Sequence, residues 1–258
     1  MIELINGDCL EEMDKLIERG IKVDAIICDP PFGITACKWD SIIPFDEMWL
    51  RLNKLIKPNG AIVLFGSEPF SSALRMSNIK HYKYDWIWEK ENGSNFATVK
   101  YQPFKVHEMV SVFGDFPLSY TKRGLKNYNP QFLQGEPYSI KRKGIQREQM
   151  RTGLHKETSL KNKGTRYPRS VIKYNTVRGG HPAEKPVPLM EFLIKTYTNK
   201  NELVLDFTMG RGTTGIGCIN TSRNFIGIEK DKEKNKGKNK NKSWFDLAKE
   251  RIYINDKE

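Results

Sequence analysis

The feature that most constrains the fold is a glycine-rich turn placed directly after an apolar strand. Residues 203–207 read as a buried strand, and TMGRGTTG follows at once, with Gly210, Gly212 and Gly215 spaced as G-x-G-x-x-G. Glycines at this spacing permit a tight turn and a close backbone approach to a ligand. A strand, a glycine turn and a following helix together predict an α/β sheet.

The same alternation of strand and helix patterns recurs along the chain. Short apolar runs predict strands, and a period near 3.6 residues predicts helices. The predicted strands cover 23–28, 61–65, 84–88, 106–113, 203–207 and 225–229, and the predicted helices cover 45–56, 186–198, 213–220 and 244–252. We therefore predict an α/β fold with helices on both faces of the sheet.

Acidic residues flank the glycine turn in positions suited to an adenosine-containing cofactor. Glu229 ends the next predicted strand, 19 residues after Gly210, where a carboxylate accepts hydrogen bonds from ribose hydroxyls. Asp206 precedes the turn, where it would face a methionine ammonium or order the loop, but would repel the pyrophosphate of a dinucleotide. This favours S-adenosylmethionine over a nicotinamide cofactor. The other cofactor-binding candidates in the loop are Phe207, Gly212, Thr213 and Thr214.

A second unusual stretch is IICDPPFG, in which a strand over 23–28 runs straight into Asp29, Pro30, Pro31 and Phe32. Two prolines fix two φ angles and remove two N–H donors. The carbonyls of Asp29 and Pro30 then stand as rigid acceptors beside a carboxylate, and Phe32 adds a flat face. This arrangement suits a planar base with an exocyclic amino group, so these four residues are the catalytic candidates. A simple strand-ending turn is the alternative.

Taken together, these stretches resemble the amino-directed DNA methyltransferases, which act on adenine N6 or cytosine N4, in the beta order of their motifs. In that order a D-P-P-Y/F motif comes first, a target-recognition region follows, and the glycine loop comes last. The stretches that carry the resemblance are GDC at 7–9, KPNGAIVLFGS at 57–67, HEMVSVF at 107–113, HPAEKPVPLMEFLI at 181–194, LDFTMGRGTTG at 205–215 and NFIGIE at 224–229. Arg211 departs from the pattern, because Ser is common there. A compact standalone enzyme of this kind would suit a phage or prophage.

The resemblance implies a Rossmann-like sheet that binds S-adenosylmethionine, and it implies roles for single residues. Asp8 would hold the cofactor's adenine amino group, Glu229 its ribose, and Lys185 its methionine carboxylate. Asp in the first position of the D-P-P-F motif resembles adenine-N6 enzymes, whereas Ser is commoner in cytosine-N4 enzymes. We therefore predict a site-specific adenine-N6 methyltransferase.

The implied chemistry needs a base outside the helical stack. Hydrogen bonds from the amine to Asp29 and to the Pro30 carbonyl would direct the nitrogen lone pair at the sulfonium methyl. The target base would be flipped out of the duplex and stacked on Phe32. Rate acceleration would come from positioning and electrostatics, without a covalent intermediate.

The formal net charge of +12 is concentrated in one block. Residues 121–180 hold 15 Lys and Arg against three acidic residues, while the remainder holds 28 of each sign. Concentrated positive charge is typical of a surface that binds nucleic-acid phosphates. We predict a target-recognition insertion over 115–180 that binds double-stranded DNA, set into a catalytic core of 1–114 and 181–258. A solubilising insert is the alternative. The run KEKNKGKNKNK at 232–242 is predicted to be a solvated loop.

Other features argue against a metal, a disulfide framework and a membrane span. The four cysteines form no CxxC pair, and HExxH fails because position 111 is Ser. The N-terminus carries charge early, and no run approaches 18 apolar residues. We expect a cytoplasmic monomer or homodimer without a signal peptide or a metal site.

Several other functions stay open on the sequence. The same chemistry would act on RNA, or on a protein side-chain amide, because related short motifs serve those substrates. A catalytically inactive nucleic-acid-binding module would keep the fold, although the intact Asp29 and the glycines argue against it. A nicotinamide oxidoreductase shares the glycine loop, but it leaves the Pro-Pro-Phe stretch and the basic block unexplained.

Overall fold

The computed structural model describes residues 1–37, 40–118, 127–142, 158–177, 184–230 and 242–255. These residues form two compact units, one of Met1–Asn129 with Ser170–Glu258 and one of Pro130–Arg169. His181, Pro182 and nearly all of the run at 232–242 lie outside the described residues. None of the helices described combines the length and the apolar character needed to cross a lipid bilayer.

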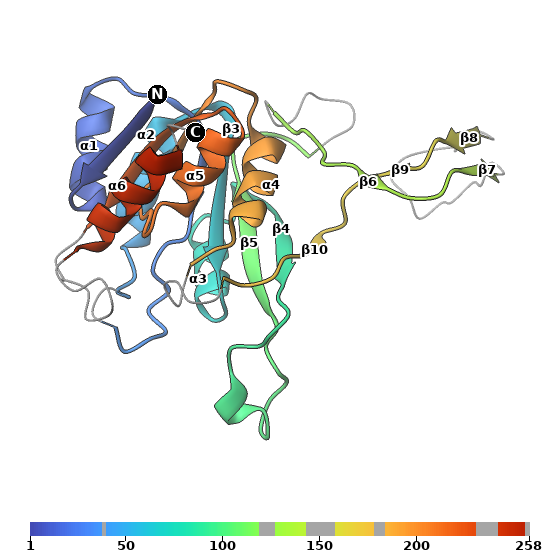
Figure 1. Cartoon of the computed structure of the whole chain (residues 1–258), viewed down its shortest axis with the longest axis horizontal. Helices are drawn as coiled ribbons and strands as arrows, with labels where there is room; N and C mark the ends of the chain where they lie inside the picture. The colour runs from blue at the N-terminus through green and yellow to red at the C-terminus, as the bar shows by residue number, and fades with distance from the viewer. Residues whose placement is uncertain (38–39, 119–126, 143–157, 178–183, 231–241, 256–258) are drawn as a thin grey trace. The chain divides into compact units, whose positions relative to one another are not determined.

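The larger unit is built on an eight-stranded sheet, which confirms the α/β prediction (Figure 1). In spatial order its strands are β1 (Ile2–Asn6), β12 (Asn224–Glu229), β11 (Leu203–Asp206), β2 (Val23–Cys28), β3 (Ile56–Gly66), β5 (His107–Phe113), β4 (Tyr82–Glu89) and β10 (Val171–Lys173). Only β5 runs antiparallel to its neighbours. The carboxyl ends of the other seven strands therefore lie along one edge of the sheet.

Helices cover both faces of this sheet, as the sequence predicted. One hydrophobic core contains residues of α1 (Cys9–Glu18), α2 (Phe45–Leu55) and α3 (Phe70–Ser77), and the other contains residues of α4 (Val187–Tyr197), α5 (Thr213–Asn220) and α6 (Trp244–Asn255). Strand β2 alternates between them: Ala25 and Ile27 join the second core, while Ile26 and Cys28 join the first. A strand buried on both faces reads as a continuous apolar run, which is why β2 was evident from its sequence.

The predicted start of strand β3 differs from the structure for a local reason. Strand β3 begins at Ile56 rather than at residue 61, because Ile56 already pairs with Val23. The register then shifts, so that Ala61 pairs with Ala25. Between these pairs the strand bulges at Asn59, whose φ of 58° lies in the left-handed region.

The smaller unit consists of two short antiparallel ladders. Strand β6 (Leu133–Gln134) pairs with β9 (Thr165–Arg166), and β7 (Tyr138–Arg142) pairs with β8 (Thr158–Asn162). Its large apolar side chains are mostly exposed, as for Phe132, Leu133, Ile140, Leu160 and Tyr167. This unit lies inside the predicted insertion but spans fewer residues, and the boundaries 115 and 180 stay a prediction.

Candidate active site

The sheet brings most of the predicted site residues to one edge. Asp29 follows β2, Asp206 ends β11 and Glu229 ends β12, and these strands are parallel. Asp8 lies two residues beyond β1, whose Asn6 pairs with Glu229. Ligands of open α/β sheets bind at the carboxyl ends of the strands. The acidic residues taken from separate motifs are thus collected where a ligand is expected.

Asp29 takes part in a row of alternating charges. Lys185 Nζ lies 2.5 Å from Asp29 Oδ2 and 3.4 Å from Glu108 Oε2. Lys90 pairs with the other oxygen of Glu108. Lys185 is only 7% exposed, and its Nζ lies 5.2 Å from the centre of the Phe65 ring and 5.7 Å from that of Phe32.

Burial and neighbouring charges shift the pKa values of this row. Burial raises the pKa of Asp29 to about 6, Lys185 opposes that rise, and the like charge of Glu108 adds to it. Burial alone would raise the pKa of Glu108, but Lys185 and Lys90 outweigh it and the pKa is lowered. Burial alone would lower the pKa of Lys185, but the two carboxylates raise it. At neutral pH the Lys185 ammonium therefore lies between the carboxylates of Asp29 and Glu108.

One carboxylate oxygen of Asp29 can still accept a hydrogen bond from a ligand. Asp29 Oδ1 is buried, and no group in the described part of the chain donates a hydrogen bond to it. Its backbone carbonyl, by contrast, accepts a hydrogen bond from Thr208 Oγ1 at 3.0 Å. A buried acceptor without a donor costs free energy until a ligand supplies one.

The segment after Asp29 is held in place from both sides. Pro30 is buried, and the Phe32 ring packs on Phe70 with ring centres 5.1 Å apart and planes tilted by 31°. Asp40 accepts backbone hydrogen bonds from Gly33, Ile34 and Thr35 at 2.8, 3.0 and 2.7 Å. Burial alone would raise the pKa of Asp40, but these hydrogen bonds lower it.

The glycine turn has the backbone that only glycine adopts readily. Gly210 and Gly212 have φ values of 53° and 75°. A Cβ at Gly210 would meet no atom of the described residues within 4 Å, whereas one at Gly212 would lie 2.6 Å from Ile252 Cδ1. Gly210 N–H donates to Glu229 Oε2 at 2.7 Å. The turn is thus open at Gly210 and packed against α6 at Gly212.

Asp206 holds the glycine turn in place through hydrogen bonds. Its carboxylate accepts hydrogen bonds from Thr214 Oγ1 at 2.5 Å and from Thr208 N–H at 3.2 Å. Burial raises the pKa of Asp206 to about 6. Thr213 and Thr214 are themselves buried at the start of α5. The loop-ordering role expected for Asp206 is the one its hydrogen bonds support.

Three predicted residues have neighbours that refine their roles. Asp8 caps α1 by accepting from Leu10 N–H at 3.0 Å, and it pairs with Lys230 at 2.6 Å. The Phe207 side chain is fully buried in the core, so only its backbone remains a candidate for cofactor contact. The Lys185 side chain forms an ion pair with Asp29. Its predicted contact with a methionine carboxylate stays a prediction.

Arg211, which departs from the family pattern, does not add an uncompensated charge. Arg211 Nη1 lies 2.9 Å from Glu184 Oε2, and Arg251 Nη2 lies 2.9 Å from Glu184 Oε1. Glu184 and Lys185 are consecutive in the chain. Together they connect the glycine turn to the Asp29 segment.

Sequence reasoning missed Glu108, Thr208 and Asp40. Glu108 and Thr208 each lie in a stretch that had been noticed, but their partners are far away in sequence. Asp40 follows the D-P-P-F motif within ten positions, and a short acidic residue after Gly33 was an available signal for a turn. Among the residues that the structure describes, no three His, Cys, Asp or Glu side chains are grouped so as to hold a metal ion.

Comparison with known proteins matches this site to one family. A family model described as DNA methylase matches residues 23–240. The type II methyltransferase M2.LlaDCHI of Lactococcus lactis subsp. cremoris is 25% identical over 275 residues, covering 96% of this chain and 88% of the relative.

Solved structures agree with this match. The M1.HpyAVI–SAM complex has a TM-score of 0.62 and 26% identity, covering 97% of this chain and 100% of that one. The cytosine-N4-specific PvuII DNA methyltransferase has a TM-score of 0.57 and covers 89% and 82%. At 16% identity, the PvuII enzyme shows similarity of fold alone.

Proposed function

The chain belongs to the DNA methylase family, and from this premise we propose that it methylates the N6 amine of adenine at specific sites in double-stranded DNA. Its methyl donor is S-adenosylmethionine, the molecule named in the M1.HpyAVI complex. The proposal is supported above all by Asp29, which has one carboxylate oxygen on Lys185 and one buried oxygen to which no described residue donates a hydrogen bond.

The residues around the glycine turn fit this cofactor. Gly210 leaves open space where a side chain would stand, and the carboxylates of Asp8 and Glu229 lie at the ends of neighbouring strands. Carboxylates accept from an adenine amino group and from ribose hydroxyls, which are the roles we propose for Asp8 and Glu229. Asp206 holds the turn through Thr208 and Thr214.

The chain's own contribution to the reaction is to hold the amine. When bound, S-adenosylmethionine supplies an electrophilic methyl group. An ionised Asp29 accepts a hydrogen bond from the target amine, and Lys185 keeps that carboxylate ionised. The Pro30 carbonyl accepts a hydrogen bond from the second N–H of the amine, and Phe32 packs against the base. Positioning of this kind lowers the barrier without a covalent enzyme intermediate.

The choice of adenine over cytosine rests on Asp29 standing first in the D-P-P-F motif. A fold shared with a cytosine-N4-specific enzyme does not separate the two bases. Both target amines are exocyclic and both hydrogen-bond to a carboxylate. An experiment therefore has to establish first whether adenine or cytosine is methylated.

The test starts with wild-type protein and tritium-labelled S-adenosylmethionine. Duplex DNA and RNA are offered separately, and the products are digested to nucleosides. We expect label in N6-methyl-2′-deoxyadenosine from DNA. Label in N4-methylcytosine would overturn the choice of base, and label in RNA alone would overturn the choice of nucleic acid. Methylation-aware sequencing of DNA from cells that express the protein then gives the site.

The role of Asp29 is tested with Asp29→Ala. We expect methyl transfer to be abolished while cofactor affinity stays within roughly an order of magnitude of wild type, since Asp8 and Glu229 remain. Asp14→Ala is the matched control, because Asp14 is a half-exposed carboxylate that pairs with Arg51 on the helical side. Near-normal turnover of Asp29→Ala would refute the assignment.

We further propose that residues 115–180 recognise the DNA. The described part of the smaller unit exposes Lys141, Lys161, Lys163 and Arg169. Arg166 lies over the Tyr138 ring at 4.5 Å and bonds Asn162, so its guanidinium is already used to order the unit. Exposed lysines supply phosphate contacts, which make affinity depend steeply on salt.

The recognition proposal predicts a change in salt dependence. The triple variant Lys141→Gln/Lys161→Gln/Lys163→Gln should weaken binding to duplex DNA and flatten the slope of log Kd against log salt by about 1 per lost phosphate contact. Lys249→Gln, on the exposed face of α6, serves as the control. An unchanged slope in the triple variant would count against recognition by this unit.

A further inference from the structure

A long loop between β4 and β5 begins and ends at the same edge of the sheet as Asp29. Strands β3 and β4 both run antiparallel to β5, so their carboxyl ends lie at that edge. Residues 90–106, here named the β4–β5 loop, leave the sheet at this point and project beyond it, as Figure 1 shows in green. A duplex that covers the Asp29 edge would come within reach of this loop.

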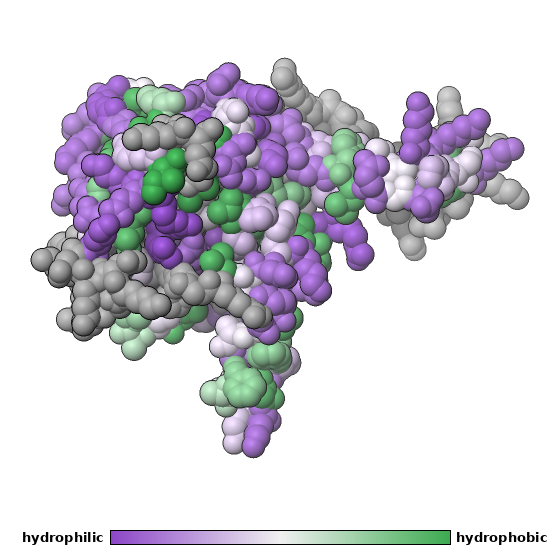
Figure 2. Space-filling view, viewed as in Figure 1, coloured by the Kyte–Doolittle hydropathy of each residue, from purple (hydrophilic) through white to green (hydrophobic). Residues whose placement is uncertain are grey.

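The β4–β5 loop carries the two most exposed large apolar side chains in the described part of the chain. Tyr101 is 88% exposed and Phe96 is 80% exposed. Phe96 begins a single 3-10 turn, η1 (Phe96–Thr98). Figure 2 shows hydrophobic residues on the projecting segment, next to hydrophilic ones. Aromatic rings that are exposed together on a projection indicate a binding surface rather than packing.

Hydrogen bonds within the loop hold its tip in one conformation. The Asn95 side chain donates to the Pro103 carbonyl at 3.0 Å and accepts from Lys105 N–H at 2.7 Å. Gln102 Nε2 donates to Thr98 Oγ1 at 2.6 Å. The rings therefore stand on an ordered support, which reduces the entropy that binding would cost.

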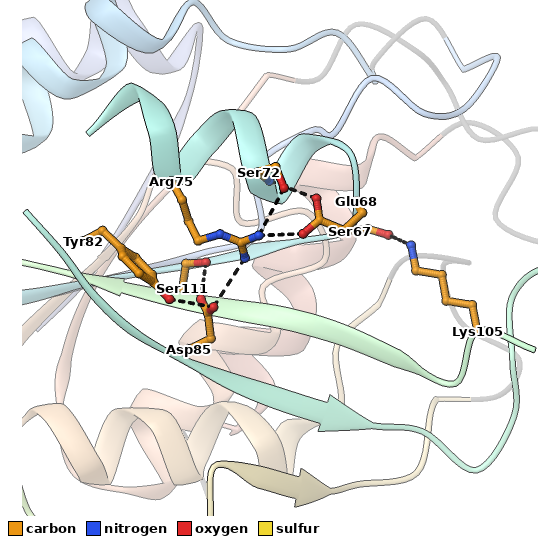
Figure 3. A network of polar contacts seen from close by, with 8 residues as sticks. All are labelled: Ser67, Glu68, Ser72, Arg75, Tyr82, Asp85, Lys105 and Ser111. Atoms are coloured by element: carbon orange, nitrogen blue, oxygen red, sulfur yellow. Dashed lines mark hydrogen bonds and ion pairs between the residues drawn. The ribbon is translucent and has the colours of Figure 1, made fainter. Parts of the chain in front are cut away.

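The base of the loop is joined to the candidate active site. Lys105 Nζ donates to Ser67 Oγ, directly after β3 (Figure 3). At the other end of the loop, Lys90 pairs with Glu108, which contacts Lys185. The β4–β5 loop and Asp29 thus belong to one series of ionic contacts, so the loop has a defined place beside the site.

Charge indicates which partner the loop would bind. The β4–β5 loop contains three lysines and one acidic residue, Glu91, whose carboxylate accepts hydrogen bonds from Thr176. A duplex offers phosphates to the ammonium groups and base faces to Phe96 and Tyr101, and base–aromatic stacking works with every base. Aromatic rings beside an excess of lysines match DNA better than a neutral apolar protein surface.

We propose that the aromatic tip of the β4–β5 loop, Phe96 and Tyr101, contacts the duplex beside the target base and stacks on bases exposed when that base is flipped out. The inference rests on the proposed function and adds to it a surface that lowers the cost of extrusion. Apolar and aromatic side chains that enter a base step offset unstacking in this way.

The test compares wild type with the double variant Phe96→Ala/Tyr101→Ala on two duplexes. Both contain the site found by methylation-aware sequencing. In one the target base is paired, and in the other it faces an abasic position and needs no unpairing. We expect the variant to lose about tenfold or more in kcat/KM on the paired duplex and to approach wild type on the abasic duplex. Cofactor affinity, measured by calorimetry, should not change.

The control variant is Ile79→Ala. Ile79 is 58% exposed but lies before β4, at the opposite end of that strand, and its change should alter neither rate. Tyr101→Phe keeps the ring and should keep most of the activity. An equal loss on both duplexes, or no loss on either, overturns the inference; unaltered DNA affinity would then assign the tip to a protein partner. Wild-type protein that methylates no DNA instead overturns the proposed function itself.

Discussion

Lys185 Nζ lies 2.5 Å from Asp29 Oδ2, although the two residues are 156 positions apart in the chain. This contact predicts how the reaction depends on pH. The pKa of Asp29 is already raised to about 6 by burial, and the Lys185 charge is the main influence that holds it down. Ionised Asp29 is the form that accepts a hydrogen bond from the amine, so activity should fall as the pH drops through about 6.

Lys185→Met should therefore move the acidic limb of the rate profile to higher pH. Without the ammonium group, the Asp29 carboxylate is harder to ionise in its buried position. We expect a large loss of kcat at pH 7 that is partly recovered at alkaline pH. Lys195→Met is the control, because Lys195 lies on α4 with its Nζ 3.5 Å from Glu191 at the surface. If the acidic limb of the Lys185→Met profile lies at the same pH as in wild type, Lys185 does not set the charge of Asp29.

Glu108→Gln should move the same limb in the opposite direction. Glu108 is a like charge that raises the pKa of Asp29, and it also shares Lys185 with that residue. Its removal leaves Lys185 to Asp29 alone, so the limb should shift to lower pH. The profile is measured at saturating DNA and cofactor so that binding does not contribute. Shifts of the same sign in Glu108→Gln and Lys185→Met would contradict this electrostatic scheme.

The sequence predicted those elements whose pattern lies in one contiguous stretch of residues, and it missed others. Strands β2 and β11 contain short apolar runs, at 25–28 and 203–205, and both strands were expected from the sequence. Helix α1 was missed although Asp8 caps it, Glu11 follows in the first turn, and Met13 and Leu16 point to the core. Strand β10 pairs over three residues with β4, and so short a strand has no period of its own to detect.

The residues of the candidate active site also fall into two groups, those that the sequence predicted and those that it did not. Asp29, Phe32 and the glycine turn are contiguous motifs whose residue types carry their chemistry, so they were proposed from the sequence. Thr208 and Glu108 act through partners 179 and 77 residues away, at Asp29 and Lys185. Such contacts are created by the order of strands in the sheet. A single sequence does not state that order, and hence these two residues appeared only in the structure.

Asp206→Asn should stabilise the fold at neutral and alkaline pH. Burial raises the pKa of Asp206 from 3.8 to about 6, so the native state binds a proton more tightly than the unfolded chain does. Stability is then lost as the pH rises through this window, by up to about 3 kcal/mol. We expect urea unfolding to show a gain of about 1–2 kcal/mol for the variant at pH 8, since Asn keeps one acceptor for Thr214. The gain should vanish near pH 4.

Asp40→Asn provides the opposite case. Burial alone would raise the pKa of Asp40, but hydrogen bonds from the Thr35 side chain and from three backbone N–H groups outweigh burial, so the pKa is lowered. Its contribution is present at neutral pH and lost as the pH falls below the ordinary value. The variant should therefore lose about 1–3 kcal/mol at pH 8. If both variants respond alike at pH 8, the two carboxylates do not differ as the structure indicates.

The last prediction separates the two glycines of the turn. Alanine at either position must adopt a positive φ, which costs about 1–2 kcal/mol. At Gly212 the added carbon would also lie 2.6 Å from Ile252 Cδ1 and 3.3 Å from Ala248 Cβ, so the Ile252 side chain would have to turn away and Ala248 would have to move slightly. Gly212→Ala should therefore lower the free energy of unfolding by about 2–4 kcal/mol, and Gly210→Ala by only about 1–2 kcal/mol.

Cofactor binding should rank the same two variants in reverse. No atom of the described part of the chain would lie within 4 Å of a Cβ at Gly210, and the Gly210 N–H orients Glu229 at the proposed ribose position. A methyl group there would occupy the path by which a cofactor approaches the turn. Calorimetry should show S-adenosylmethionine affinity reduced about tenfold or more in Gly210→Ala, and less in folded Gly212→Ala. Equal affinities in Gly210→Ala and wild type would mean that the cofactor does not approach the chain at Gly210.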